Sequence, residues 1–152
     1  MARIKESVEI AAAPATVFRF CHDMARRSEW DERVIAAKLI TPAPLRRGSL
    51  IRIDAGHSGA FHFTWEAEYI RYQFPSGSTV KAYDVAPSSP FKSGTEQWAF
   101  DKTGDGTRLT LTWEYKPRSL LARLMDFIMR RTATRHAIQR SLQNLKTMIE
   151  AE

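Results

Sequence analysis

The sequence predicts an α+β fold in which an antiparallel β-sheet is covered by one long C-terminal helix. Between Val34 and Tyr115, apolar and polar residues alternate in stretches separated by turn residues, a pattern typical of a half-buried meander. After Pro117 the chain has no glycine or proline up to Glu152, and its apolar residues recur at helical spacing. A sheet with one apolar face needs a cover, and this helix is the obvious one.

The N-terminal part predicts a strand followed by short helices. Ile4, Val8 and Ile10 belong to an alternating stretch that indicates a first strand. The next stretch, AAAPATVFRFCHDM, predicts a helix with Pro14 in its first turn, where proline is tolerated. The stretch RRSEWDERV then predicts a loop or a short helical turn.

The middle of the chain predicts further strands joined by short connections. The connection DKTGDG is a strong hairpin signal. Because consecutive strands are joined so closely, we expect neighbours to pair antiparallel. The expected strands cover Val34–Thr41, Ser49–Asp54, Phe61–Tyr69, Thr79–Val85, Glu96–Phe100 and Leu109–Tyr115.

The C-terminal helix is expected to cover about 30 residues and to span roughly 45 Å. Cations interrupt its apolar stripe at Arg131 and Arg135. We favour a stripe that drifts onto Ala133 and Ala137, which let helix and sheet approach. The alternative is that one of these arginines points into a cavity and meets an anionic ligand group. The stripe consists of Leu121, Leu124, Ile128, Ile138, Leu142, Leu145 and Ile149.

Composition sets broad limits. The 152 residues suit a single domain spanning 1–152, and the hydrophobic fraction of 43% supports a packed core. A net charge of +6 fits an anionic partner, although ordinary solubility is the favoured interpretation. Cys21 is the only cysteine, and no segment is apolar enough for a signal peptide or a membrane span. We therefore expect a cytoplasmic protein.

The order of elements resembles the START-like superfamily, also called the SRPBCC or Bet v 1-like fold, and most closely its polyketide cyclase/dehydrase-type bacterial proteins. The resemblance lies in SVEIAAAPATVFRFCHDMARRSEWDERV at one end and SLQNLKTMIEAE at the other. It implies a helix-grip fold: a seven-stranded antiparallel sheet wrapped around the long C-terminal helix, with two short helices after the first strand. It also implies an apolar cavity that binds a hydrophobic ligand. In this pattern Trp30 is largely buried in a structural role, with ligand contact as the alternative, while Glu29, Asp31 and Glu32 face water.

The aromatic residues of the strands are the best candidates for ligand contact. They share strand faces, so they either line the expected cavity or fill the core. Tyrosine hydroxyls would supply a few polar contacts. The candidate ligand-binding residues are Phe61, Phe63, Trp65, Tyr69, Tyr83, Trp98, Phe100, Trp113, Tyr115, Arg131 and Arg135.

The signal for catalysis is weak. Glu96 shares a strand face with Trp98 and is the best-placed acid, although a charge at the edge of the sheet or an ion pair is the favoured interpretation. Asp84 is a second candidate. His57 and His62 give a poor metal signal, and His62 is expected to face solvent. We expect neither metal nor cofactor.

Three functions remain open. The first is binding of a small hydrophobic molecule, and the second is a polyketide cyclase or dehydratase. The third is a lipid or quinone carrier that docks on membranes through the basic, apolar stretch RSLLARLMDFIMRR. We favour packing of that stretch on the sheet over membrane contact. No motif indicates nucleic-acid binding, and the sequence leaves the oligomeric state open.

Overall fold

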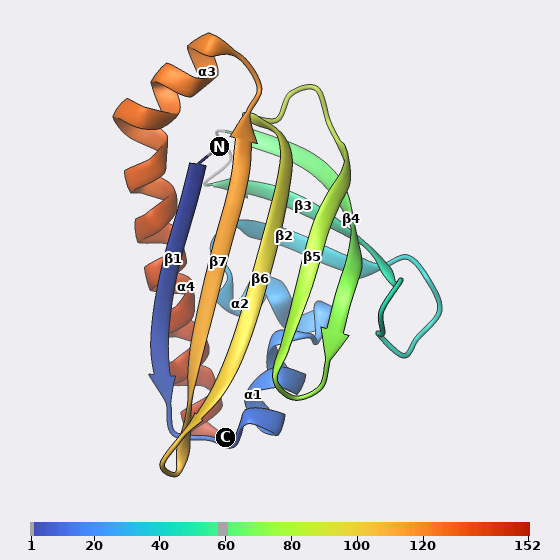
Figure 1. Cartoon of the computed structure of the whole chain (residues 1–152), viewed down its shortest axis with the longest axis vertical. Helices are drawn as coiled ribbons and strands as arrows, with labels where there is room; N and C mark the ends of the chain where they lie inside the picture. Colours follow the sequence, from blue (N-terminus) through green and yellow to red (C-terminus); the bar gives the residue numbers. More distant parts are fainter. Residues whose placement is uncertain (1, 58–60) are drawn as a thin grey trace.

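The computed structural model describes residues 2–57 and 61–152, apart from the side chains of residues 57 and 61. One antiparallel sheet of seven strands, in the order β1-β7-β6-β5-β4-β3-β2, curls around the C-terminal helix (Figure 1). The predicted helix-grip architecture is confirmed. The strands are β1 (Ala2–Ile10), β2 (Val34–Leu39), β3 (Leu50–His57), β4 (Phe61–Gln73), β5 (Gly77–Val85), β6 (Phe91–Thr103) and β7 (Gly106–Pro117).

The strands follow the alternation of the sequence. In β4, Trp65 and Tyr69 are buried on the concave face, whereas Glu68 points away from it and is exposed. The pairing of β4 with β5 shifts register twice, between Glu66 and Ala67 and between Tyr69 and Arg71. Such bulges bend a strand and increase its twist, which helps the sheet to curl around the helix.

Short helices close one end of the sheet. They are α1 (Pro14–Cys21), the 3₁₀-helix η1 (Met24–Arg26) and α2 (Arg27–Trp30). The expected burial of Trp30 is confirmed: its side chain is 1% exposed and meets Trp98 edge to face. The expectation that Asp31 faces water is wrong. Asp31 is 0% exposed because two arginines hold its carboxylate inside the protein.

The C-terminal helix runs from Leu120 to Ala151 in three parts: α3 (Leu120–Met125), the π-helical turn η2 (Asp126–Arg130) and α4 (Arg131–Ala151). The predicted stripe is confirmed along α4, where Ile138, Leu142, Leu145 and Ile149 are buried.

In α3 and η2 the predicted stripe is wrong, because Leu121, Leu124 and Ile128 are exposed. A π-helical turn holds more residues than an α-helical turn, so it rotates the preceding segment relative to α4. The face that continues toward the sheet therefore consists of Ala122, Asp126 and Arg130, and the apolar positions of the sequence pattern point outward.

Candidate ligand-binding cavity

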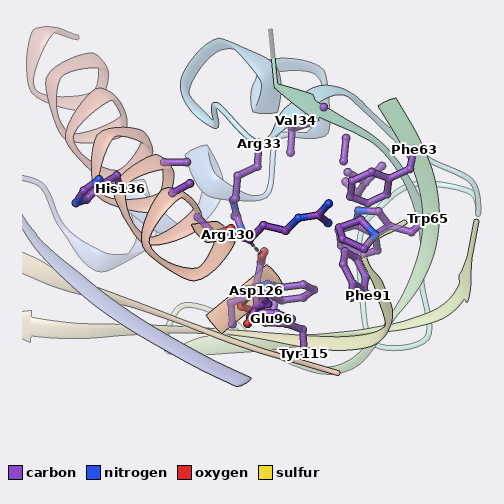
Figure 2. A pocket seen from close by; sticks show the side chains of 18 of the residues that line it. Arg33, Val34, Phe63, Trp65, Phe91, Glu96, Tyr115, Asp126, Arg130 and His136 are labelled. Atoms are coloured by element: carbon purple, nitrogen blue, oxygen red, sulfur yellow. Dashed lines mark hydrogen bonds and ion pairs between the residues drawn. The ribbon is translucent and has the colours of Figure 1, made fainter. Parts of the chain in front are cut away.

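A cavity of about 520 Å³ lies between the concave face of the sheet and the C-terminal helix. Figure 2 shows Phe63, Trp65 and Phe91 together on one side of the cavity, and Tyr115 beside Asp126 and Glu96. Small-molecule sites in proteins have volumes of about 300–1,000 Å³, so the volume of this cavity lies within their range.

The aromatic wall of the cavity comes from three strands. Phe63 and Trp65 belong to β4, Phe91 to β6, and Trp113 and Tyr115 to β7. The Phe91 ring meets the Trp113 ring edge to face at 5.2 Å between centroids, whereas Trp113 and Tyr115 stack at 5.7 Å with an angle of 16°. The stacked pair presents ring faces and edges in fixed orientations, a surface suited to a flat aromatic or conjugated ligand.

Gly94 on β6 makes room for one ring of this wall. A Cβ atom at that position would overlap the six-membered ring of Trp113, well inside van der Waals contact with Cη2. The absence of a side chain therefore lets the Trp113 indole lie flat against the β6 backbone. Gly94 therefore allows the Trp113 ring to form part of the cavity wall without projecting into the cavity.

Four charged side chains form a closed network where the cavity meets α2. Asp31 accepts from Arg27 and Arg33 at 2.9 Å each, and Glu96 accepts from the same two arginines at 3.1 and 3.0 Å. The indole Nε1 of Trp98 also donates to Glu96, at 2.8 Å. Two cations and two anions balance, so the network adds fixed, directed charge to the cavity but no net charge.

The ionisation of the network follows from its geometry. Burial by itself would raise the pKa of the Asp31 carboxyl, but the guanidinium groups of Arg33 and Arg27 outweigh burial and hold that pKa well below its ordinary value. Burial would likewise lower the pKa of Arg27, yet Asp31 and Glu96 together raise it. Asp31 and Arg27 therefore stay charged at neutral pH. Glu96, engaged by two arginines and an indole, is poorly placed to exchange protons with a ligand.

A second polar group lies on the helix side of the cavity. The Tyr115 hydroxyl donates to Oδ1 of Asp126 at 2.5 Å, and Arg131 donates to Oδ2 at 3.3 Å. Asp126 is 4% exposed. Burial and the Asp126 carboxylate both raise the pKa of Tyr115, so its hydroxyl keeps its proton at neutral pH. From the same turn, the Arg130 side chain extends into the cavity toward Phe63 and Trp65 (Figure 2).

The structure divides the candidate aromatic residues into two groups. Phe63, Trp65, Trp113 and Tyr115 line the cavity, as does Glu96. Other members pack beneath the short helices and fill the core. In that group the Phe100 ring lies 5.0 Å from Phe18, the Tyr69 ring lies 5.8 Å from His22, and Trp98 meets Trp30.

The remaining candidates lie away from the cavity or outside the described side chains. Tyr83 is on the outer face of the sheet, where its hydroxyl donates to Glu66 at 2.9 Å. Asp84 and His62 are exposed as well, in keeping with the expectation for His62. The side chains of Phe61 and His57 are not among those described. In the described part of the chain, no three His, Cys, Asp or Glu side chains are arranged to hold a metal ion.

The two helix arginines singled out by the sequence both form ion pairs. Arg131 bonds to Asp126, and Arg135 bonds to Glu6 on β1 at 2.8 Å. Ala133 and Ala137 both belong to the cavity lining, where Ala137 is buried and Ala133 is exposed, so helix and sheet do not close together at these alanines. The arginines of the helix that belong to the lining are Arg130 and Arg140.

Several lining residues are not evident from the sequence. Phe91 lies in a stretch whose turn residues indicate a connection, and Arg27 and Arg33 lie in one whose charges indicate a solvated loop. Asp126 carries a detectable signal, since it is the one acid between Lys116 and Arg131. Nothing local marks Arg130, because its direction depends on the π-helical turn.

Comparisons with known proteins agree with this fold. A profile of the family described as "Polyketide cyclase / dehydrase and lipid transport" matches residues 1–150. A protein from Thermus thermophilus has a TM-score of 0.82 at 17% identity, covering 99% of this chain and 98% of that one. The Zhui aromatase/cyclase from Streptomyces sp. R1128 has a TM-score of 0.79 at 14% identity, with coverage of 98% and 93%.

A plant protein has the same fold. The major latex-like protein 151 of Panax ginseng has a TM-score of 0.69 at 12% identity, covering 97% of this chain and 96% of that one. A comparison with curated protein sequences gives no match. Identities this low show a shared fold, so the chemistry of the site has to come from its own residues.

Proposed function

Because the chain belongs to the polyketide cyclase / dehydrase and lipid transport family, we propose that its cavity binds one small, largely apolar molecule with a flat conjugated part and a polar end. The membership also confirms the START-like resemblance of the sequence. The observation that carries the proposal is that an aromatic wall and charged side chains of the C-terminal helix line the same cavity. The wall, with Trp113 stacked on Tyr115, would hold the conjugated part. Asp126 and Arg130 would meet hydroxyl or carbonyl groups of the same molecule.

A titration with a panel of ligands tests this proposal. Polyhydroxylated polycyclic aromatics, quinones and a saturated fatty acid are added to the protein, and quenching of tryptophan fluorescence is followed. We expect saturable 1:1 binding of the first two classes and weaker binding of the fatty acid.

Two matched variants locate the binding site. Ala137→Phe places a ring in the lining, and Ala36→Phe places one at an exposed position of β2. The first should abolish binding and the second should preserve it. The proposal fails if no compound binds saturably, or if both variants bind as the wild type does.

A second candidate function, cyclisation or dehydration of a polyketide-like substrate, is favoured by the Tyr115–Asp126 pair. The Asp126 carboxylate would accept a proton from the carbon next to a carbonyl group. The Tyr115 hydroxyl keeps its proton at neutral pH and donates it to Asp126 in this structure. As Asp126 takes up the substrate proton, this hydroxyl would turn to the oxygen on which negative charge develops. The Streptomyces neighbour is named an aromatase/cyclase, which supports the same chemistry for this fold.

Variants separate binding from catalysis. Asp126→Asn and Tyr115→Phe keep the shape of the cavity and remove the proton acceptor or the hydroxyl donor. If the protein is an enzyme, both should bind a linear poly-β-keto substrate mimic with little change and cyclise it at least about a hundredfold more slowly than the wild type. If the wild-type protein binds the mimic without converting it, the enzymatic function is refuted and only the binding function remains.

A further inference from the structure

The outer face of α3 and η2 is an exposed apolar surface. Six large apolar side chains lie within ten consecutive residues, and their exposed fractions run from 54% to 82%. Other exposed apolar side chains, such as Ile35 and Ile70, are scattered over separate strands. The six residues, called here the apolar ridge, are Leu120, Leu121, Leu124, Phe127, Ile128 and Met129.

The orientation of the ridge is fixed by the helix itself. The π-helical turn directs Asp126 toward the sheet, where Tyr115 and Arg131 hold its carboxylate. Phe127, Ile128 and Met129, which lie between Asp126 and the cavity-lining Arg130, then face outward. Figure 1 shows α3 at the start of the C-terminal helix, at the top of the view, whereas α4 runs alongside β1 below it. Contiguous exposed apolar surface of this kind marks an interaction site.

A basic pocket lies next to the ridge. It has a volume of about 240 Å³ and is lined by Lys92, Lys116, Pro117, Arg118, Ser119, Leu120 and Arg123. Within the described residues, its lining holds four cations and no acid. Arg118 donates to the carbonyl oxygens of Ser89, Ala86 and Phe91, so it fixes the loop before β6. Lys92, Lys116 and Arg123 are exposed.

We propose that this end of the molecule docks on the surface of an anionic phospholipid bilayer. The ridge would enter the boundary between headgroups and acyl chains, and the basic pocket would receive a lipid phosphate. Charge complementarity selects this occupant: the stretch from Lys116 to Arg131 holds five cations and one acid, and that acid, Asp126, is buried. Among the described residues, none of the helices has the length and apolar character needed to cross a membrane.

Docking would also bring the cavity to the lipid. Ala122, Asp126 and Arg130 line the cavity from the same two helical segments that carry the ridge. None of the ridge residues belongs to the described lining, so docking can be tested without reference to what the cavity holds. Failure of the ligand titration therefore does not affect this proposal, and failure of docking does not affect the proposed function.

Vesicle flotation tests the proposal. The full chain is mixed with vesicles of phosphatidylcholine alone or with one third phosphatidylglycerol, at low and at high salt. We expect binding to the anionic vesicles that weakens as salt increases. Leu121→Glu should weaken it by about tenfold or more, because an apolar anchor is lost and an acid is added. Arg123→Gln should weaken it by about fivefold.

Matched controls come from exposed positions elsewhere. Ile70→Glu on β4 and Lys81→Gln on β5 make the same kinds of change on other strands, and both should float as the wild type does. The proposal is overturned if the protein does not bind anionic vesicles in preference to neutral ones, or if the ridge variants bind unchanged. It is also overturned if sedimentation shows a dimer that Leu121→Glu dissociates while vesicle binding is absent, since the occupant is then a second copy of the chain.

Discussion

Glu96 illustrates how one buried side chain can connect three parts of the fold. From β6 it bonds to Arg27 of α2, to Arg33 just before β2, and to the indole of its neighbour Trp98. Strand alternation correctly places Glu96 on the concave face with Trp98 but gives no sign of its partners. Those partners come from a stretch rich in charge, and local pattern alone cannot show which of its charges turn inward. The burial of Trp30 follows from the family pattern, whereas that of the neighbouring Asp31 does not.

Glu96→Gln should destabilise the protein strongly. The substitution preserves shape but leaves two buried guanidinium groups with one carboxylate between them, and breaking a buried ion pair in this way costs about 3–5 kcal/mol. Urea denaturation measures the change in the free energy of unfolding. Glu66→Gln is the control, because its pair with Arg52 lies on the outer face of the sheet, where ion pairs contribute little to stability. Equal losses in the two variants would contradict the role assigned to the buried network.

His22 should make stability fall in mild acid. Burial lowers its pKa from 6.5 to about 4, and the ring bonds to the Phe18 carbonyl and the Ser78 hydroxyl. Between these two pH values the unfolded chain binds a proton that the folded protein does not, so the free energy of unfolding decreases as pH falls from 6.5 toward 4. The contribution is fully present above pH 6.5. Urea denaturation of wild type and His22→Gln from about pH 7.5 to 4.5 should show a smaller decrease for the variant; parallel curves would refute the assignment.

The C-terminal helix shows what a regular pattern predicts and where it fails. Its apolar stripe correctly places Ile138, Leu142, Leu145 and Ile149, because α4 keeps the regular helical period. The prediction assumes that this period also holds before Arg131. The π-helical turn from Asp126 to Arg130 breaks the period, so the helix face predicted to be buried is rotated away from the sheet in the first third of the helix. No residue in DFIMR marks such a turn. The sequence therefore predicts the helix but not which face of its first third meets the cavity.

The strand β6 should not tolerate a side chain at Gly94. In Gly94→Ala the new methyl group would meet the Trp113 ring and push it toward the cavity. We expect a loss of about 1–3 kcal/mol in the free energy of unfolding, as for other overpacked cores, together with weaker ligand binding. Urea denaturation and fluorescence titration measure the two effects. Trp113→Phe in the same chain removes the outer ring and should recover most of the stability; no recovery would show that Gly94 is needed for another reason.

Across the whole molecule the concave face divides into two parts. Near α1 the rings of Phe18, Tyr69, Trp98 and Phe100 pack densely with the short helices, and nearer α3 the remaining rings line the cavity. Sequence alternation can predict that all of these side chains face inward. It cannot predict the division, because the division depends on how far the short helices and the first third of the C-terminal helix reach over the sheet.

The central proposal is that the space between sheet and helix is a ligand site and not a flaw in packing. Native mass spectrometry of the protein purified from cells, followed by solvent extraction, examines this without assuming a ligand. We expect one apolar, conjugated molecule per chain in the wild type and none in Ala137→Phe. A wild-type protein that is empty as purified and retains no member of the ligand panel after incubation would contradict the assignment of the cavity as a binding site.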